Sequence, residues 1–217
     1  MNTQSEFPNL KVVNHPLIAH KLTRMREVSC LVPEFRKLIS DISYLMLFPL
    51  TQNLAMTTRE IQTPFDKMNA PTLAEKEPIL VPILRAGEGM MEPLISMMPN
   101  ATIYHVGVYR DKETHLPQEY LNKLPEKLPQ DRRIIVVDPL LATGHSALHT
   151  IELILARGGR AENISMLSVL SVPEGVQLLL EKQPKVQVFT SAMDSHLNET
   201  AYMVPGIGDA GDRIYGT

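Results

Sequence analysis

Residues 134–146 (IIVVDPLLATGHS) combine an apolar strand, an acidic residue and hydroxyl groups at the start of a helix. The strand ends in Asp138, and Thr143, Gly144 and Ser146 surround the helix start. Backbone N–H groups there, together with Thr and Ser hydroxyls, can cradle a phosphate group, and a carboxylate at the strand end can accept hydrogen bonds from sugar hydroxyls. An ordinary strand–loop–helix junction with Ser146 as N-cap would show the same pattern. The spacing matches neither a Walker loop nor a dinucleotide-binding turn.

Two arginines lie at the ends of other apolar strands. Arg85 follows residues 79–84 (ILVPIL). It opens a turn that contains Gly87 and Gly89, whereas Arg110 ends the next apolar stretch. An arginine beside free backbone N–H groups suits a dianion such as diphosphate. Either arginine alone fits a solvated turn equally well, but two at one edge of a sheet strengthen the prediction of an anion site.

The tail of the chain is rich in glycine and carries two carboxylates, Asp209 and Asp212. Of the 11 glycines, four lie at or after residue 206. The backbone groups of such a loop can hydrogen-bond the edge of a planar base, and a carboxylate can hold hydrated Mg²⁺. A frayed terminus is the alternative, but Met203 and Ile207 among the glycines indicate that the tail packs against the protein.

An alternation of strands and helices is expected to position these three motifs. The expected strands are 79–84, 102–109, 133–137, 164–170 and 186–190, and the expected helices are 33–48, 90–98, 146–157 and 174–182. Because the strands are rich in Ile and Val on both faces, they predict an α/β fold with a mostly parallel central sheet flanked by helices. Such sheets bind ligands at the carboxyl ends of their strands, where the three motifs lie. The proline-punctuated residues 49–78, with a strand expected at 57–63, predict an arm or hairpin.

Composition excludes several classes of protein. The length of 217 residues fits one domain, and 21 basic against 24 acidic residues give a net charge of −3, which argues against a nucleic-acid partner bound through bulk positive charge. A single cysteine, Cys30, allows neither an internal disulfide nor a cysteine metal cluster. No apolar run approaches the ~20 residues of a membrane span, and the first ten residues do not resemble a signal peptide. We therefore expect a cytoplasmic protein with no membrane partner.

The motifs together resemble the uracil phosphoribosyltransferases, a branch of the type I phosphoribosyltransferases. The resemblance runs from about residue 15 to the end and is weaker at 44–76 and 114–133. It implies a single phosphoribosyltransferase domain with a β-arm at about 50–78, a mobile cover loop at about 111–130 and a uracil-binding hood at about 192–217. The matching segments are His15-Pro16-Leu17, His20-Lys21-Leu22-Thr23, Pro82-Ile83-Leu84-Arg85-Ala86-Gly87, Gly89-Met90, Tyr109-Arg110, Val137-Asp138-Pro139, Leu141-Ala142-Thr143-Gly144, Pro173-Glu174-Gly175 and Pro205-Gly206-Ile207-Gly208-Asp209-Ala210-Gly211-Asp212.

In this family, 5-phosphoribosyl 1-diphosphate (PRPP) and uracil give UMP and diphosphate, a reaction of pyrimidine salvage. The resemblance implies that Arg85 and Arg110 bind the diphosphate and that Asp209 engages PRPP and its Mg²⁺, without a dedicated protein metal site. Asp209 and Arg110 are thus the implied catalytic residues. The implied ribose phosphate site is Asp138, Pro139, Leu140, Leu141, Ala142, Thr143, Gly144, His145 and Ser146, and the implied uracil site is Met203, Gly208, Asp209 and Ala210. The resemblance also implies a homodimer or higher homo-oligomer, and GTP binding at a site that no motif locates.

One position inside the phosphate loop departs from the family pattern. The family usually reads Ala-Thr-Gly-Gly-Ser, whereas this chain has His145 in place of the second glycine. If the position needs a positive φ, a histidine there costs roughly 1 kcal/mol or more and deforms the cradle; if φ is ordinary, the cradle is retained. A catalytically weakened relative that binds PRPP or nucleotide is therefore one alternative. A pyrimidine-responsive RNA-binding regulator is another, disfavoured by the net charge and by the lack of a Lys/Arg run.

Overall fold

The structure of the protein is a computed structural model that describes residues 7–110 and 117–217, leaving out the side chains of Arg110 and Pro117. These residues form a nine-stranded sheet whose main path runs β1-β11-β10-β8-β4-β6-β7. The pairings along this path are parallel except that between β6 and β7. The predicted mostly parallel sheet is confirmed. Its strands are β1 (Leu10–Val12), β4 (Ile79–Leu84), β5 (Thr102–Ile103), β6 (Val106–Arg110), β7 (Pro117–Asn122), β8 (Ile134–Val137), β9 (Leu140–Leu141), β10 (Ile164–Ser171) and β11 (Gln187–Met193).

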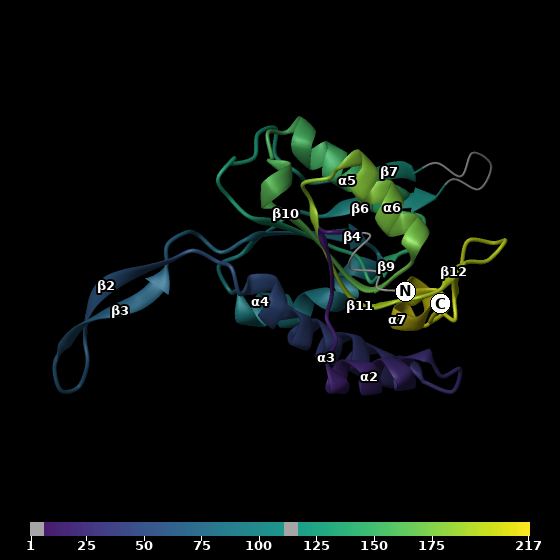
Figure 1. Cartoon of the computed structure of the whole chain (residues 1–217), viewed down its shortest axis with the longest axis horizontal. Coiled ribbons are helices and arrows are strands. Elements are labelled where there is room, and N and C mark those ends of the chain that lie inside the picture. The colour runs from purple at the N-terminus through teal and green to yellow at the C-terminus, as the bar shows by residue number, and fades with distance from the viewer. Residues whose placement is uncertain (1–6, 111–116) are drawn as a thin grey trace.

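Helices cover both faces of this sheet (Figure 1). Helices α5 (His145–Ala156) and α6 (Pro173–Lys182) lie on one face, and α2 (Pro16–Arg26), α3 (Val32–Thr51) and α4 (Met91–Met97) lie on the other. Each face has its own apolar core, because alternate residues of a strand point to opposite sides. Strand β8 shows this alternation: Ile135 and Val137 pack with α2–α4, whereas Ile134 and Val136 pack with α5 and α6. Nowhere in the described ranges does a helix have the length and apolar character needed to cross a membrane.

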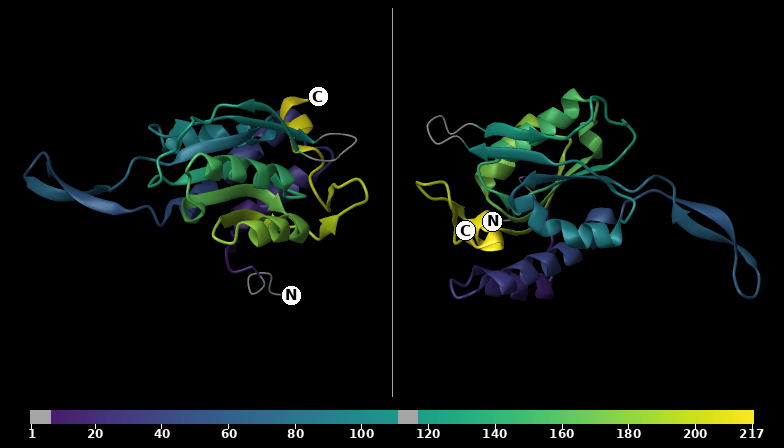
Figure 2. Two further views of the ribbon diagram at one scale, coloured as in Figure 1. Left: turned by 90° about the horizontal axis from the view of Figure 1, so that it is seen from above. Right: turned by 180° about the vertical axis from the view of Figure 1, so that it is seen from behind.

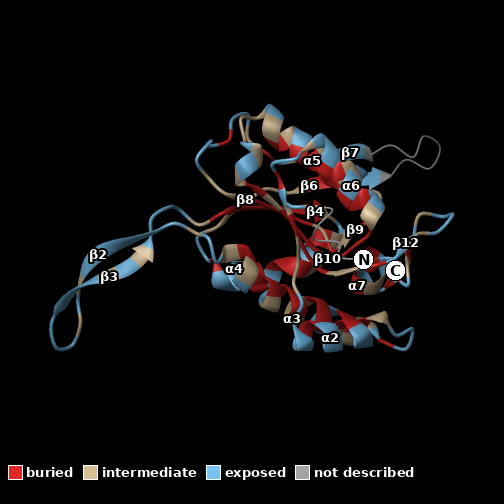
Figure 3. Cartoon of the chain, viewed as in Figure 1, coloured by how far each residue is buried: buried red, intermediate tan, exposed pale blue. Residues whose placement is uncertain are grey.

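A two-stranded hairpin projects from the body of the molecule (Figures 1 and 2). Its strands, β2 (Met56–Gln62) and β3 (Lys67–Leu73), pair antiparallel from Met56 opposite Leu73 to Gln62 opposite Lys67. Almost every residue of the hairpin is exposed (Figure 3). The strand expected at 57–63 overlaps β2. The hairpin contributes nothing to either core, so its packing partners lie outside the chain itself or are water.

Some predicted boundaries differ from those in the structure. Helix α3 begins at Val32 and continues to Thr51, with Pro49 in its last turn, where a missing N–H removes a single hydrogen bond. The strand expected at 102–109 is two strands, β5 and β6, because the chain between them turns so that the Tyr104 N–H donates to Leu80 O. The helix expected at 90–98 is preceded by a 3₁₀ turn, η1 (Ala86–Met90), and begins as α4 at Met91.

Several elements have no counterpart in the sequence prediction. These are β1, α2, β7, the β12–β13 pair (His196–Leu197 and Met203–Val204) and the short helix α7 (Ala210–Tyr215), besides the two-residue strands β5 and β9. Strand β7 and the buried Leu124 and Leu128 lie in the segment 111–130, where a mobile cover loop was expected. Residues 111–116 of that expected loop lie outside the described residues. From Pro117 onward the segment is paired with β6 or packed in the core, so a cover loop of the expected length is not what the structure has.

Candidate active site

The loop after β8 is pinned along the neighbouring strand β10. The carbonyl of Pro139 accepts hydrogen bonds from the N–H groups of Val169 (2.9 Å) and Leu170 (3.0 Å). Strand β9 then pairs with the end of β10, with Leu140 opposite Leu170 and Leu141 opposite Ser171. The loop that follows Asp138 therefore starts from a rigid base, although it has little regular structure of its own.

Two glycines let the loop and the start of α6 approach each other closely. Gly144 is the N-cap residue of α5 and has a φ of 82°. A Cβ on Gly144 would lie 2.7 Å from Gly175 O, and a Cβ on Gly175 would lie 2.2 Å from Ala142 O. Both contacts are with backbone, which cannot move aside. The start of α6 thus supports the loop from behind, a role for Gly175 that the sequence motif alone did not indicate.

His145 adopts an ordinary helical backbone as the first residue of α5. Among the residues that the structure describes, Ala201 is the one non-glycine with a positive φ, and the positive φ of the phosphate loop belongs to Gly144. The His145 side chain is exposed. The condition under which we expected a deformed loop is therefore not met, and the first-turn N–H groups of α5, which have no partner within the helix, remain available.

Arg85 follows β4 at the same edge of the sheet. Its side chain is exposed, with Nη2 3.6 Å from Asp212 Oδ1 and the guanidinium 5.7 Å from the centre of the Tyr215 ring. The Tyr215 hydroxyl donates to Arg85 O at 3.0 Å. Arg85 thus lies between the sheet and α7. Arg110 ends the adjacent strand β6, which pairs with β4 through Leu84 opposite Gly107.

The glycine turn after Arg85 is packed rather than open. Gly87 is buried against the end of β8, where a Cβ would lie 2.3 Å from Val137 O. A Cβ on Gly89 would lie 2.7 Å from Ile214 Cδ1 of α7. The expectation that this turn offers free backbone N–H groups to an anion is wrong for Gly87. These glycines instead bring η1 against β8 and α7.

The tail folds into a packed structure around two glycines with positive φ, Gly206 (68°) and Gly208 (76°). A Cβ on Gly206 would lie 2.3 Å from Met203 O, so this position accepts glycine alone. Asp209 is the N-cap residue of α7, and its Oδ1 accepts a hydrogen bond from the Asp212 N–H at 2.9 Å. Gly208 and Asp209 are exposed, whereas Met203 and Ala210 are buried. The tail is therefore not frayed, and it presents Gly208 and Asp209 outward.

The two acidic residues of the site influence each other electrostatically. Burial raises the pKa of Asp138 to about 7, and the negative charge of Asp209 adds to this rise. A hydrogen bond from the Leu140 N–H opposes it. Asp138 as a whole residue is half-buried, so its carboxyl group is the part that is removed from water. The tail and the loop after β8 thus meet at one site, where two carboxylates face a shortage of positive charge.

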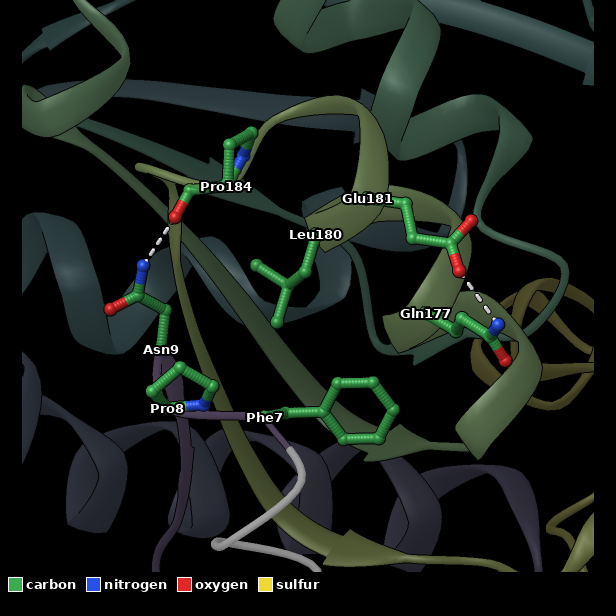
Figure 4. Close-up of a pocket in the computed structure, with 7 residues that line it drawn as sticks. All are labelled: Phe7, Pro8, Asn9, Gln177, Leu180, Glu181 and Pro184. Carbon is green, nitrogen blue, oxygen red and sulfur yellow. Dashed lines mark hydrogen bonds between the residues drawn. The ribbon is translucent and has the colours of Figure 1, made fainter.

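The structure brings most of the predicted site residues to one end of the sheet. Figure 1 shows β9, β12 and α7 at this end. A separate hollow of about 400 Å³ lies elsewhere, between the start of β1 and the far part of α6 (Figure 4). Its walls combine apolar and amide groups, and none of them belongs to the predicted site. The hollow is lined by Phe7, Pro8, Asn9, Gln177, Leu180, Glu181 and Pro184.

Sequence reasoning missed the residues that fasten the tail. Arg26 and Asp194 bond to Gly206, and Arg213 of α7 reaches back to the carbonyl groups at the end of α2. The signal was present in the segment 15–23, which matched the family but received no role. That segment forms most of α2, whose last residue is Arg26.

Comparisons with known proteins agree with this arrangement. A family model for uracil phosphoribosyltransferase matches residues 12–217. The chain is 47% identical to the uracil phosphoribosyltransferase of Paraburkholderia phymatum and 46% identical to that of Ralstonia pickettii, covering 100% of this chain and 99% of each relative.

Solved structures give the same result for the fold. The AQ2163 protein from Aquifex aeolicus superposes with a TM-score of 0.89 at 29% identity, over 96% of this chain and 98% of the other. An adenine phosphoribosyltransferase from Trypanosoma brucei shares the fold with a TM-score of 0.55 at 12% identity, over 94% and 89%. With a family model that spans nearly the whole sequence and relatives that align from end to end, this chain belongs to the uracil phosphoribosyltransferase family.

Proposed function

We propose that this chain transfers the 5-phosphoribosyl group of PRPP to uracil, giving UMP and diphosphate. The observation that carries the proposal is the meeting of the loop after β8 with the tail, where Asp209 acts on the pKa of Asp138. A phosphate loop and a base-reading tail at one sheet edge are what a reaction between a ribose phosphate and a base requires. Family membership supplies the identity of the base.

The ribose 5-phosphate of PRPP is assigned to residues 138–146. The first-turn N–H groups of α5, with the hydroxyls of Thr143 and Ser146, suit the phosphate, and the helix dipole adds to their attraction. Asp138, at the end of β8, is placed for the ribose hydroxyls. Rigid support from β10 and from Gly175 fixes this loop before the substrate arrives, which lowers the entropy lost on binding.

The diphosphate is assigned to Arg85 and Arg110, at the ends of the paired strands β4 and β6. No cluster of three or more His, Cys, Asp or Glu side chains in residues 7–110 and 117–217 is arranged to hold a metal ion. The mutual charge of Asp138 and Asp209 fits a divalent cation that arrives with PRPP, because carboxylates and phosphates are the oxygen ligands that Mg²⁺ prefers. When bound, Mg²⁺ would neutralise part of the diphosphate charge.

Uracil is assigned to the tail. The backbone of Gly208, Asp209 and Ala210, with Met203 beneath, offers donors and acceptors for the edge of a pyrimidine. As the bond between ribose and diphosphate breaks, positive charge develops on the sugar. The carboxylates of Asp138 and Asp209 stabilise that charge while the arginines stabilise the departing diphosphate. The chain's contribution is therefore electrostatic and positional, and it needs no side-chain nucleophile.

The test is UMP formation by the purified chain from uracil, PRPP and Mg²⁺, with cytosine and orotate as control bases. We expect turnover with uracil, and at least a hundredfold lower kcat/KM with either control. A folded protein that forms no UMP at millimolar substrates would disprove the proposal. Selective turnover of orotate would replace uracil as the substrate.

We also infer that the chain functions as a homodimer built on the hairpin and its base. Large apolar side chains are exposed at the base of the hairpin, among them Phe48 (78% exposed) and Met97 (62%). They border a hollow of about 300 Å³ between α3, α4 and the hairpin. A two-stranded hairpin is marginally stable in water by itself, so burial against a second copy would stabilise it. The hollow is lined by Tyr44, Leu47, Phe48, Thr51, Leu54, Leu73, Glu77, Met97 and Met98.

A further inference from the structure

One ion pair holds the tail, and its residues make none of the ligand contacts assigned above. Arg26 is the last residue of α2, and Asp194 directly follows β11. The Arg26 guanidinium donates to both carboxylate oxygens of Asp194, with 3.1 Å between Nη1 and Oδ2. The side chain of Asp194 is 2% exposed and that of Arg26 is 24% exposed. A pair so far removed from water is costly unless its remaining hydrogen-bonding capacity is used.

That remaining capacity is used on Gly206. The Gly206 N–H donates to Asp194 Oδ2 at 2.9 Å, and Gly206 O accepts from Arg26 Nη1 at 2.8 Å. Both polar groups of this residue therefore end on the ion pair. Gly206 also has a positive φ and no room for a Cβ. The geometry of the tail at this residue is fixed by its own backbone and by the Arg26–Asp194 pair.

Arg213 extends the same hold by one residue. Its Nη1 donates to Ile207 O at 2.9 Å and to Met25 O at 2.6 Å, while its guanidinium lies 4.4 Å from the centre of the Phe35 ring. Two consecutive carbonyl groups, of Gly206 and Ile207, thus face arginines. The next residues, Gly208 and Asp209, are exposed. The hold ends where the proposed uracil contacts begin.

We propose that Arg26 and Asp194 are positioning residues for uracil. By holding Gly206 on both sides, they fix the direction in which Gly208–Ala210 present their backbone groups, without touching the base. The inference rests on the proposed function, because it assumes that this backbone reads uracil. Hydrogen bonds to a base need donors placed to within a fraction of an ångström, so a loosened support weakens binding even when the reading groups remain.

The role requires the planar, forked side chain of arginine. A lysine at position 26 would keep the charge opposite Asp194, but its single nitrogen cannot reproduce the separate contacts that Nη1 and Nη2 make. The change Arg26→Lys therefore loosens Gly206 while leaving Asp194 compensated. A matched control exists on the same helix: Arg24 pairs with Glu34 at an exposed site away from the tail, so Arg24→Lys makes the same chemical change without affecting Gly206.

The experiment compares the wild-type chain with Arg26→Lys, Asp194→Asn and Arg24→Lys. Steady-state UMP formation gives kcat and the KM for each substrate, and amide hydrogen exchange reports on residues 204–210 against 134–146. For Arg26→Lys we expect the KM for uracil to rise about tenfold, with kcat and the KM for PRPP within about twofold of wild type. We expect faster exchange in 204–210 and unchanged exchange in 134–146. Arg24→Lys should match wild type in every measurement.

An unchanged KM for uracil in an active Arg26→Lys enzyme would overturn the inference, and so would an equal rise in both KM values. A wild-type chain that forms no UMP would instead disprove the proposed function, together with the base-reading role of the tail. If Asp194→Asn alone leaves Arg26 uncompensated and unfolds the chain, the double variant Arg26→Gln/Asp194→Asn removes both charges. That variant should fold and should still show the rise in the KM for uracil; a wild-type value there would also overturn the inference.

Discussion

Asp138 carries a cost in the free protein that its substrate would relieve. Its carboxyl group is removed from water and faces the charge of Asp209, and these effects raise its pKa to about 7. In the unfolded chain the pKa of an aspartate lies near 4. The folded protein therefore holds the proton more tightly than the unfolded chain does. As pH rises from about 4 to about 7, the free energy of unfolding falls, and it remains lower above that range.

Replacing Asp138 by asparagine should remove this cost. Without substrates at pH 8, we expect Asp138→Asn to be more stable than wild type by on the order of 1–3 kcal/mol, with the difference shrinking toward zero at pH 4. Thermal unfolding followed by circular dichroism at the two pH values measures this. Asp131→Asn, at an exposed position, serves as control. A variant no more stable than wild type at pH 8 would show that the Asp138 carboxyl is not desolvated.

The histidine in the phosphate loop should matter less than its neighbour. Because His145 has an ordinary helical backbone, we expect His145→Gly to change the KM for PRPP by less than about threefold. Gly144→Ala should raise it at least tenfold, since φ is 82° and the new Cβ would lie 2.7 Å from Gly175 O. Steady-state kinetics with varied PRPP gives both values. A gain of orders of magnitude in kcat/KM for His145→Gly would instead identify the natural chain as a weakened relative.

Between elements, the contact of α6 with the phosphate loop sets the shape of the PRPP site. A Cβ on Gly175 would lie 2.2 Å from Ala142 O and 2.7 Å from Leu141 O, so Gly175→Ala forces the loop and helix apart. Overpacking of this kind costs typically 1–3 kcal/mol. We expect a lower unfolding temperature and a higher KM for PRPP, with the KM for uracil little changed.

The matched control for that contact lies on the same helix. Gln177 is exposed on α6 and faces away from the loop, so Gln177→Ala should leave both KM values and the unfolding temperature near those of wild type. Differential scanning calorimetry and steady-state kinetics measure the two effects. If Gly175→Ala behaved like Gln177→Ala, the support of the loop by α6 would be refuted.

The elements of the parallel sheet could be predicted from sequence because burial on both faces leaves uninterrupted runs such as ILVPIL and RIIVV. Strand β7 could not, because it is a polar edge strand whose pairing with β6 is set by a non-local register. Helix α7 is too short for periodicity to show, and Asp209, its N-cap, was taken only for a ligand residue. In the site, the loop residues followed from strand ends, whereas Arg26 and Asp194 act across 168 positions of sequence, beyond any local pattern.

At the scale of the whole molecule, the apolar base of the hairpin predicts the oligomeric state. Phe48 is 78% exposed beside Met97 and the 300 Å³ hollow, and burying such a side chain stabilises an interface by about 1.5–3 kcal/mol. Phe48→Glu would place a charge there. We expect wild type to elute with the mass of a dimer or a multiple of it, and Phe48→Glu to shift toward the monomer at micromolar concentration.

Size-exclusion chromatography with light scattering makes that measurement. Leu17→Glu is the control, because Leu17 is 53% exposed on α2 and lies away from the hairpin. It should leave the mass unchanged. A monomeric wild type would disprove the homodimer, and an unchanged dimer in Phe48→Glu would place the interface on another surface.

The fastening of the tail to α2 also has a consequence for the order of folding. Arg26 and Gly206 are separated by 180 positions, and Arg213 and Met25 by 188. Closing so long a loop is entropically expensive, and contacts of this range tend to form after local ones. The segment from β8 through α6 assembles from neighbours in sequence, whereas the tail docks only when the two ends of the chain meet. A folding intermediate would therefore acquire the capacity to bind a phosphate before it can select a base.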